Sequence, residues 1–282
     1  MSQPQPAAST ARCAVIAGKG RFPLLVTQEA KRQGLQVIVM GLKGWADPEL
    51  ARHANVYEEV QVGHLGRLIE RLKFHGVRQA VMAGQVTKAV LDDTGVVFDA
   101  LTLAILATVK DRSVPGLLGA VAERLAKDGI TLLDSSSFLT ANLCPAGPLT
   151  RRRPTAEETR DIAVGAEAAR RIASLDVGQT VLVKDGVVIA VEAVEGTNAA
   201  IRRAHAMRGP GFVVVKMAAP AHDRRFDLPV IGLDTIDTVV ETGGRCVAME
   251  QGVVLILDKD AVIQAADTAK LCLIGIEPPA AP

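Results

Sequence analysis

Aromatic side chains are scarce in this sequence, which has one Trp, one Tyr and six Phe among its 282 residues. Proteins that bind single-stranded nucleic acid stack the bases on aromatic rings, so the composition argues against that class. The charges nearly cancel, with a formal net charge of +1, which also argues against a surface that coats nucleic acid. We therefore expect no nucleic-acid partner.

Long apolar runs and paired cysteines are also missing. No stretch of about 18 apolar residues is uninterrupted, and the polar N-terminus has no apolar signal core, so we expect neither a membrane span nor a signal peptide. The cysteines lie far apart in sequence, without the spacing of a zinc site or a redox motif. We expect buried thiols in a reducing cytosol and a soluble cytoplasmic protein that can still act at a membrane surface. The cysteines are Cys13, Cys144, Cys246 and Cys272.

What the sequence does contain is an alternation of strand and helix patterns. Hydrophobic residues make up 49% of a chain long enough for two domains, each with its own core. In the first half this alternation predicts a parallel sheet with helices on both faces. Ligands of such sheets bind where strands end, and the glycines at 18, 20 and 84 fall at strand ends. Strands are expected at 13–18, 36–42 and 79–84, and helices at 22–33, 64–76 and 117–129.

The second half has the same character after an interruption at 143–155. Three prolines and three consecutive arginines there are typical of a linker; attraction of Arg151–Arg153 to anionic lipid or phosphate is the less favoured alternative. The Asp185-Gly186 pair between two apolar runs predicts a hairpin. Helices are expected at 155–174, 197–209 and 234–244, a strand at 211–218, and a final strand, helix and strand from 252 onward. The expected division is residues 1–143, a linker at 144–155, and an α/β domain with an embedded hairpin at 156–282.

The first candidate site is the loop AGKGRFP, residues 17–23. Its glycines allow close backbone approach, its two cations add positive charge, and the N-terminus of a helix follows. A dinucleotide fingerprint needs a third glycine where Pro23 stands, and a phosphate loop needs Gly-Lys-Ser/Thr. A tight turn is therefore about as well supported as a ligand loop. The candidate substrate contacts are Gly18, Lys19, Gly20 and Arg21.

Two further strand ends offer polar contacts. In the stretch 191–203, a glycine and a Thr-Asn cap open a helix whose free N–H groups and dipole attract phosphate, although an ordinary capped helix competes with this interpretation. On an alternating strand only one of the two glutamates there need face the site. The candidates are Gly84, Gln85 and Lys88 at the earlier strand end, and Glu192, Gly196, Thr197 and Asn198 at the later one.

The best single candidate is the stretch 215–232, VKMAAPAHDRRFDLPVIG. Mg²⁺ prefers hard oxygen ligands and typically takes one or two carboxylates, with water and phosphate oxygens at its other positions. Guanidinium groups suit bidentate contacts with phosphate. A solvated loop with surface ion pairs is the competing interpretation. The candidate catalytic residues are Lys216, Asp223, Arg224, Arg225 and Asp227, of which Asp223 and Asp227 are the candidate metal ligands.

In this order the motifs resemble those of the LpxI family, the UDP-2,3-diacylglucosamine pyrophosphatases of lipid A synthesis. The similarity covers nearly all of the chain after the first dozen residues. The motifs that carry it are IAGKGRFP, AGQVTK, DGITLLDSSSFL, VVIAVEAVEGTNAAI, VVVKMAAPAHDRRFDLPVIG and VVLILD. The resemblance implies a Mg²⁺-dependent hydrolase that cleaves the pyrophosphate of UDP-2,3-diacylglucosamine to UMP and 2,3-diacylglucosamine 1-phosphate, or lipid X. It also implies a Rossmann-like first domain with a parallel sheet, a second α/β domain and a ligand cleft between them.

The chain departs from the family pattern at two motifs. The turn that often reads Glu-Gly-Thr-Asp has Asn198, and the loop that often reads Lys-Pro-x-Gln-Asp has Ala219 and His222. Asn198 keeps an oxygen but no charge, so Asp223 and Asp227 are the stronger metal candidates. The resemblance leaves open a transient contact with the cytoplasmic face of the inner membrane, and a homo-oligomer.

Other functions remain in competition at this point. A non-catalytic binder or carrier of a nucleotide sugar or acylated sugar phosphate would share the loops but need no metal. Carboxylates beside a bound phosphate repel it unless a cation lies between them, so the acidic loop favours the metal enzyme. A nicotinamide dehydrogenase is disfavoured by Pro23 and by the lack of a ribose-binding acid after the second strand. The apolar run 98–109 lines an acyl-chain groove or is plain core.

Overall fold

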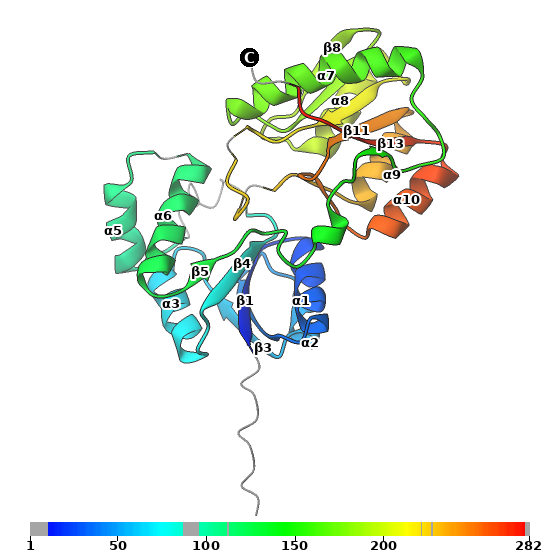
Figure 1. The fold of residues 1–282 in the computed structure, drawn as a ribbon. Helices are drawn as coiled ribbons and strands as arrows, with labels where there is room; N and C mark the ends of the chain where they lie inside the picture. Colours follow the sequence, from blue (N-terminus) through cyan, green and yellow to red (C-terminus); the bar gives the residue numbers. More distant parts are fainter. Residues whose placement is uncertain (1–10, 87–95, 112, 221, 227, 280–282) are drawn as a thin grey trace, which may run out of the picture. The chain divides into compact units, whose positions relative to one another are not determined.

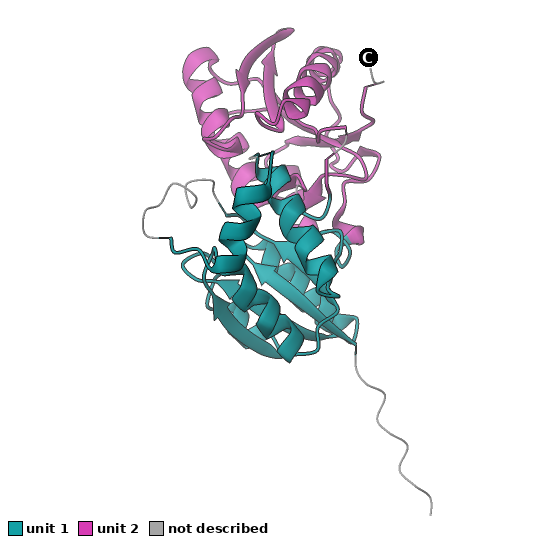
Figure 2. Ribbon diagram, turned by 90° about the vertical axis from the view of Figure 1, so that its left-hand side faces the viewer, with its two compact units in different colours: residues 1–139, 224–226 teal, residues 140–223, 227–282 magenta. Residues whose placement is uncertain are grey.

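The computed structural model describes residues 11–86, 96–111, 113–220, 222–226 and 228–279. The chain falls into two compact units, drawn in two colours in Figure 2. The first comprises residues 1–139 and 224–226, and the second residues 140–223 and 227–282. Two predicted site residues, Lys88 and Asp227, lie outside the described residues.

The first unit is built on a parallel five-stranded sheet in the order β3-β2-β1-β4-β5. The central strands carry nearly continuous apolar runs, as expected for parallel strands buried on both faces. The strands are β1 (Arg12–Ala17), β2 (Gln36–Leu42), β3 (Val56–Val60), β4 (Gln79–Ala83) and β5 (Thr131–Leu132).

Helices cover both faces of this sheet, as Figure 1 shows. They are α1 (Phe22–Arg32), α2 (Leu50–His53), α3 (Leu65–Phe74), α5 (Ala100–Thr108) and α6 (Val114–Lys127). Helix α1 contacts β1, β2 and β4, whereas α3 and α6 share a core cluster with the other face. In that cluster Leu68 and Leu72 of α3 and Leu125 of α6 are buried against Ile16 and Ile38. The helix predicted at 64–76 is therefore confirmed, and its leucines form its buried face.

The second unit contains a mixed six-stranded sheet in the order β6-β13-β11-β9-β7-β8. Strands β9, β11 and β13 are parallel, and β7 is antiparallel to both of its neighbours, so β8 runs in the same direction as β9. The hairpin predicted at Asp185-Gly186 is present, with positive φ at both residues. The strands are β6 (Gly147–Pro148), β7 (Thr180–Lys184), β8 (Val187–Val191), β9 (Val213–Lys216), β11 (Cys246–Glu250) and β13 (Cys272–Ile276).

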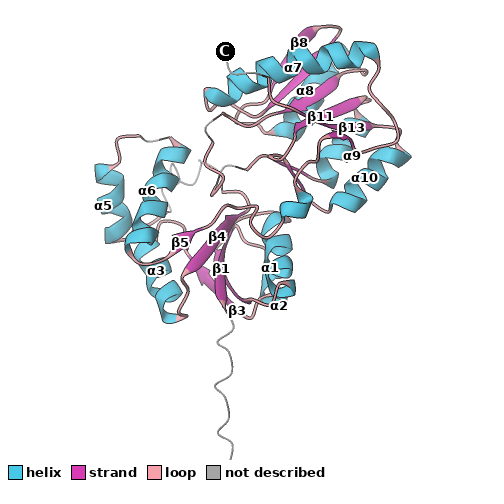
Figure 3. Cartoon of the chain, viewed as in Figure 1, coloured by secondary structure: helices cyan, strands magenta, loops and turns pink. Residues whose placement is uncertain are grey.

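The remaining elements of the second unit sandwich this sheet (Figure 3). They are α7 (Ala156–Ser174), α8 (Thr197–Arg208), α9 (Leu233–Glu241), α10 (Lys259–Thr268), the 3-10 turn Thr140–Asn142, and a separate pair β10 (Val230–Ile231) and β12 (Leu255–Ile256). Helix α7 packs on one face, where Ala169 meets Val213 and Val215. Helices α8 to α10 pack on the other, where Ile201 and Ile236 meet the strands.

Several strands differ from the sequence prediction. Strand β11 was not predicted, and of the strand expected from 252 only Leu255–Ile256 pairs, after a turn that follows Glu250. Strand β3 was missed because it lies at the edge of its sheet and carries two glutamates. These errors arise because a hydrophobicity pattern does not show where a turn interrupts an apolar run or which strand lies at the edge of a sheet.

The mixed α/β architecture itself is confirmed, whereas the ligand cleft expected between two domains stays a prediction. All four cysteines are buried and free, as predicted, and burial raises the pKa of the Cys13 thiol to about 12. No helix within the described residues has the length and apolar character needed to cross a membrane.

Candidate functional site

The two glycine loops of the first unit meet at the carboxyl ends of β1 and β4. Gly18 N donates to Ala83 O at 2.8 Å, and Lys19 and Gln85 exchange two backbone hydrogen bonds of 2.9 Å. A Cβ at Gly18 would lie 2.8 Å from Gln85 O, and one at Gly84 would lie 2.8 Å from Lys19 O. Both glycines are therefore explained by the close approach of the two loops, which converge at the strand ends.

The side chains of this loop pair remain available at the surface. Lys19 and Gln85 are exposed, and Gly20 has φ +102° with open space where a Cβ would be. Helix α1 starts just after Arg21, with Pro23 in its first turn, and no side chain caps it. Its first N–H groups thus form an uncapped positive end beside two glycines, which suits an anion.

A third strand end brings a distant segment to this edge of the first sheet. Arg224 Nε donates to Asp134 Oδ2 at 2.6 Å, and Arg224 Nη2 to Ser136 Oγ at 3.1 Å. The buried Ser135 hydroxyl lies 2.8 Å from Met82 O and 2.7 Å from Arg225 O. The segment 224–226 therefore belongs to the first unit, beside the strand end that leads into Gly84.

Asp134 is ionised in this arrangement. Burial alone would raise its pKa, but the Ser136 hydroxyl and N–H, followed by the Arg224 guanidinium, hold the pKa below its ordinary value. This Asp-Ser-Ser sequence belongs to the family motif DGITLLDSSSFL, but no site residue was predicted in it. Its signal was its position directly after an expected strand.

In the second unit, four side chains meet where β8 and β9 end and β7 begins. Lys216 Nζ donates to the hydroxyl oxygens of Thr180 and Thr197, at 3.1 Å each. Thr197 Oγ1 donates to Glu192 Oε1 at 2.7 Å, and Glu192 Oε2 lies 3.6 Å from Lys216 Nζ. The Lys216 side chain is only 5% exposed and that of Glu192 12%. This cluster is a buried ion pair bridged by two hydroxyls, and Thr180 was not predicted from the sequence.

The cluster is attached to the amino end of α8. Burial alone would raise the pKa of Glu192, but attraction by Lys216 and the threonine hydroxyls lowers it below its ordinary value. Gly196 precedes the helix with φ +83°, and no side chain caps it. Glu195, by contrast, pairs with Arg203 near the surface. Of the two glutamates only Glu192 faces inward, and its role towards a substrate stays a prediction.

The acidic loop leaves β9 next to a second buried ion pair. Glu250, at the end of β11, accepts from Arg170 Nη1 at 2.9 Å and from Ala218 N at 2.9 Å. Lys216 and Ala218, two residues apart at the end of β9, are thus held by Glu192 and Glu250 respectively. The root of the loop is therefore fixed. Further along the loop, His222 and Asp223 are partly buried.

The structure thus separates residues that the sequence analysis grouped together. Lys216 belongs to the buried cluster of the second unit, whereas Arg224 and Arg225 are attached to the first. Asn198 lies at the start of α8, where its Nδ2 is 3.4 Å from Asp234 O. Within the described part of the chain, no group of three or more His, Cys, Asp or Glu side chains forms a ready metal cage. Mg²⁺ typically takes only one or two carboxylates, so a magnesium site does not need such a group.

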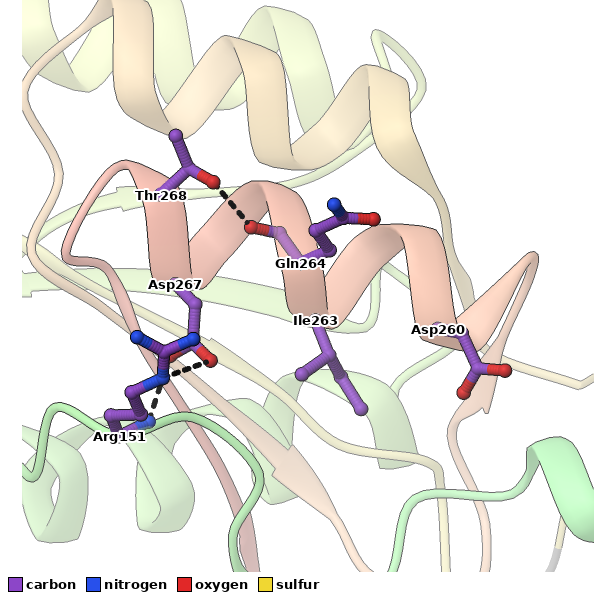
Figure 4. Close-up of a pocket in the computed structure, with 6 residues that line it drawn as sticks. All are labelled: Arg151, Asp260, Ile263, Gln264, Asp267 and Thr268. Carbon is purple, nitrogen blue, oxygen red and sulfur yellow. Dashed lines mark hydrogen bonds and ion pairs between the residues drawn. The ribbon is translucent and has the colours of Figure 1, made fainter.

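A depression of about 390 Å³ lies along α10, and none of the residues that line it is a predicted site residue (Figure 4). Arg151 and Asp267 form an ion pair across it at 3.3 Å, and the Thr268 hydroxyl is used within the helix, donating to Gln264 O at 2.8 Å. The side chain of Arg151 is 90% exposed. Two of the three consecutive arginines are thus paired, because Arg152 binds Glu158.

Comparison with known families accounts for nearly the whole chain. The family model of the LpxI N-terminal domain matches residues 12–142, and that of the LpxI C-terminal domain matches residues 145–274. The chain belongs to the LpxI family. A curated relative, UDP-2,3-diacylglucosamine pyrophosphatase LpxI of Caulobacter vibrioides, is 32% identical over 275 residues, which cover 94% of this chain and 97% of that protein. The family resemblance found in the sequence is confirmed.

Solved structures give much weaker matches than the LpxI family. CobK precorrin-6A reductase matches with a TM-score of 0.28 and 12% identity, covering 97% of this chain and 90% of its own. The biotin carboxylase domain of the Hydrogenobacter thermophilus 2-oxoglutarate carboxylase matches with a TM-score of 0.28 and 13% identity, over 71% of this chain and 41% of that one. Neither likeness is close enough to support an inference.

Proposed function

We propose that this LpxI-family chain hydrolyses the pyrophosphate of UDP-2,3-diacylglucosamine to UMP and 2,3-diacylglucosamine 1-phosphate. The observation that carries the proposal is the 32% identity over 94% of the chain to a relative named for this pyrophosphatase activity. In the reaction water adds to one phosphorus atom as its bond to the bridging oxygen breaks, and the proton of water is released. The two acyl chains imply a substrate drawn from a membrane surface, here the cytoplasmic face.

The first unit is proposed to hold phosphate or sugar in the manner of a Rossmann-like variant. The strand order 3-2-1-4-5, with helices on both faces, supports this, because ligands of such sheets bind at the carboxyl ends of the central strands. The uncapped start of α1 and the paired glycine loops lie at those ends. The proposed contacts are Gly18, Lys19, Gly20, Arg21, Gly84 and Gln85, with Lys88 as a further prediction outside the described residues.

The second unit is proposed to contribute the amino end of α8. Gly196, Thr197 and Asn198 open this helix, and its uncapped N–H groups favour a phosphate or sugar oxygen. The Thr197 hydroxyl already donates to Glu192 and accepts from Lys216. We therefore assign backbone N–H groups, rather than this hydroxyl, to the ligand. The role of the Glu192–Lys216 pair is then to fix the start of the helix.

The acidic loop is the proposed place for Mg²⁺. Its carboxylates are hard oxygen donors, and the number predicted, Asp223 with Asp227, fits the one or two that Mg²⁺ usually takes. A divalent ion there would supply positive charge against the charge that develops on the pyrophosphate oxygens. Arg224 and Arg225 are proposed to add positive charge at the strand ends of the first unit, where Asp134 binds the Arg224 guanidinium and Ser135 binds the Arg225 carbonyl.

Helix α5 is the proposed contact for the acyl chains. It contains no charged residue and none of its residues is fully buried, although Leu101 and Ile105 pack against the core of the first unit. Leu103 is 53% exposed, although it lies in the middle of the helix. Such a surface is expected to contact an apolar ligand. Leu103→Asn should raise the KM for the diacylated substrate with little change in kcat; an unchanged KM would reject this assignment.

The decisive test is release of UMP from UDP-2,3-diacylglucosamine, with Mg²⁺ and with a chelator. We expect metal-dependent release by the wild type, and loss of turnover in Asp227→Ala and Asp223→Ala. Asp260→Ala, on the outer side of α10, is the matched control and should keep wild-type turnover. Tight substrate binding without UMP under any condition would instead identify a carrier. Near-wild-type turnover of Asp227→Ala would reject that residue's role.

A further inference from the structure

The imidazole of His222 has one fixed nitrogen and one unused nitrogen. Nδ1 lies 2.9 Å from Ala219 O, and because a carbonyl oxygen can only accept, Nδ1 carries a proton and donates it. Nε2 is buried and has no hydrogen-bond partner. A buried polar atom without a partner is costly, so its presence in a folded protein requires an explanation.

The backbone around this imidazole is also fixed. His222 N donates to the same Ala219 O at 3.3 Å, so ring and main chain are held by one carbonyl group. One residue earlier, Ala218 N is bound to the buried Glu250 carboxylate. The turn that carries His222 is therefore anchored to the end of β11. The orientation of Nε2 is set by the fold.

This arrangement matches that of a metal-binding histidine. Such residues almost always donate their other ring N–H to a carbonyl or carboxylate, which fixes the tautomer and presents a lone pair to the ion. The residue that follows is Asp223, a carboxylate already assigned to the divalent ion. The unused Nε2 of His222 and the carboxylate of Asp223 together offer one nitrogen and one oxygen ligand to a metal ion, whereas the carboxylates alone would offer only oxygen.

An orphaned ring nitrogen is not by itself specific. His64 Nε2 and His205 Nδ1 are also buried without a partner. Across the described residues, however, neither of these rings donates to a backbone carbonyl, and neither residue is next to an acidic residue in sequence. His222 alone combines the three features, so His205 supplies a matched control in the same unit.

We propose that His222 binds, through Nε2, the same divalent ion as Asp223. This inference rests on the proposed function for the presence of an ion and adds a nitrogen ligand to it. Carboxylates and water suit Mg²⁺, whereas imidazole suits later transition metals such as Co²⁺. The chain is therefore expected to bind Co²⁺ more tightly than a site with oxygen ligands only.

Two substitutions of His222 distinguish the role of Nδ1 from that of Nε2. His222→Asn keeps an amide N–H near the position of Nδ1, so it can still donate to Ala219 O, but it has no atom at Nε2. His222→Gln instead places an amide oxygen near Nε2, which keeps an acceptor for Mg²⁺ and removes the nitrogen. His205→Gln removes an imidazole outside the loop whose Nδ1 is buried and without a partner.

The test is calorimetric titration of the full-length protein with Co²⁺ and with Mg²⁺, in the absence of substrate. We expect His222→Asn to weaken Co²⁺ binding by about tenfold or more, as loss of a ligand or its partner does. His222→Gln should lose Co²⁺ affinity but keep most of the Mg²⁺ affinity, and His205→Gln should change neither. The visible spectrum of bound Co²⁺ should differ between the wild type and both His222 variants.

Equal Co²⁺ affinities and identical Co²⁺ spectra in wild type and His222 variants would overturn the proposal, as would a wild type that binds no Co²⁺. If His222→Asn fails to fold in a thermal melt, the spectrum of His222→Gln decides. Failure of the proposed function is a separate result. If the wild type releases no UMP but replacement of His222 abolishes Co²⁺ binding, His222 is a metal ligand and the proposed hydrolase activity is rejected.

Discussion

At the scale of single residues, Glu58 on β3 has the clearest dependence on pH. Its carboxylate accepts two hydrogen bonds of 2.6 Å from Arg71 and lies 2.6 Å from His75 Nε2. Chiefly through the Arg71 contact, the pKa of Glu58 is lowered from 4.5 to about 2. A lowered pKa in the folded state stabilises the fold above the ordinary pKa, and this contribution disappears as the pH falls through the folded value.

We therefore expect Glu58→Gln to be less stable than the wild type at neutral pH by about 1–2 kcal/mol, since the pair is partly exposed to solvent. The difference should shrink as the pH falls from 4.5 towards 2. Thermal melts of both proteins across this range measure it. Glu70→Gln is the control, because Glu70 pairs with Arg67 at an exposed site. A difference independent of pH would contradict the assignment.

The Glu192–Lys216 pair allows a second prediction at this scale. Removing one member leaves a buried charge, which costs about 3–5 kcal/mol, whereas removing both leaves none. Glu192→Gln and Lys216→Met should each destabilise the protein strongly, and the double variant should cost less than their sum. Urea unfolding of the four proteins completes the cycle.

The same cycle distinguishes positioning from direct catalysis. If the pair fixes the start of α8, the double variant should recover part of the UMP release lost in Lys216→Met. If Lys216 contacts the substrate, the double variant should be no more active than Lys216→Met. Additive losses of stability would show that the two side chains do not interact.

At the scale of secondary-structure elements, the features that depend only on neighbouring residues could be predicted from the sequence. The Asp185-Gly186 hairpin needs positive φ at both turn residues, and this pair of residues tolerates it. The buried faces of α3 and α8 follow from helical spacing in the same way. The threonine and serine partners at the strand ends could not be predicted, because Thr180 and Ser135 make contacts across 36 and 90 residues of sequence.

Gly84 tests the pairing of the two glycine loops. It has φ +91°, and a Cβ would lie 2.8 Å from atoms of Gly18, Lys19 and Pro23, so Gly84→Ala suffers both backbone strain and collision. Gly129→Ala is the control, because Gly129 has φ +80° but open space around a Cβ. The control should cost about 1 kcal/mol, the order of backbone strain alone.

Gly84→Ala should cost clearly more in urea unfolding and should also reduce UMP release, whereas Gly129→Ala should leave release unchanged. Equal costs for the two variants would mean that the loops separate easily. The convergence of the loops would then contribute little to stability, and only the measured release would connect Gly84 with the substrate.

At the scale of the whole molecule, chain order and unit membership do not coincide. The segment Arg224–Phe226 lies well inside the second half of the sequence, yet it belongs to the first unit. Phe226 packs against the core cluster that contains Leu68 and Leu72 of α3. The sequence pattern places this segment in one acidic loop with its neighbours. The pattern does not show that three residues of that loop belong to the other unit.

This membership predicts which unit suffers when Phe226 is shortened. Phe226→Ala removes a partly buried ring from the first core and should cost about 2 kcal/mol, less than the 3–5 kcal/mol of a fully buried phenylalanine. Hydrogen exchange should become faster in β4, β5 and α3 and stay unchanged in β9 and β11. Phe212→Ala, in the core of the second unit, should give the opposite pattern. If Phe226→Ala instead accelerated exchange in β9 and β11, the segment would belong energetically to the second unit, and the anchoring of Arg224 by Asp134 would not explain its position.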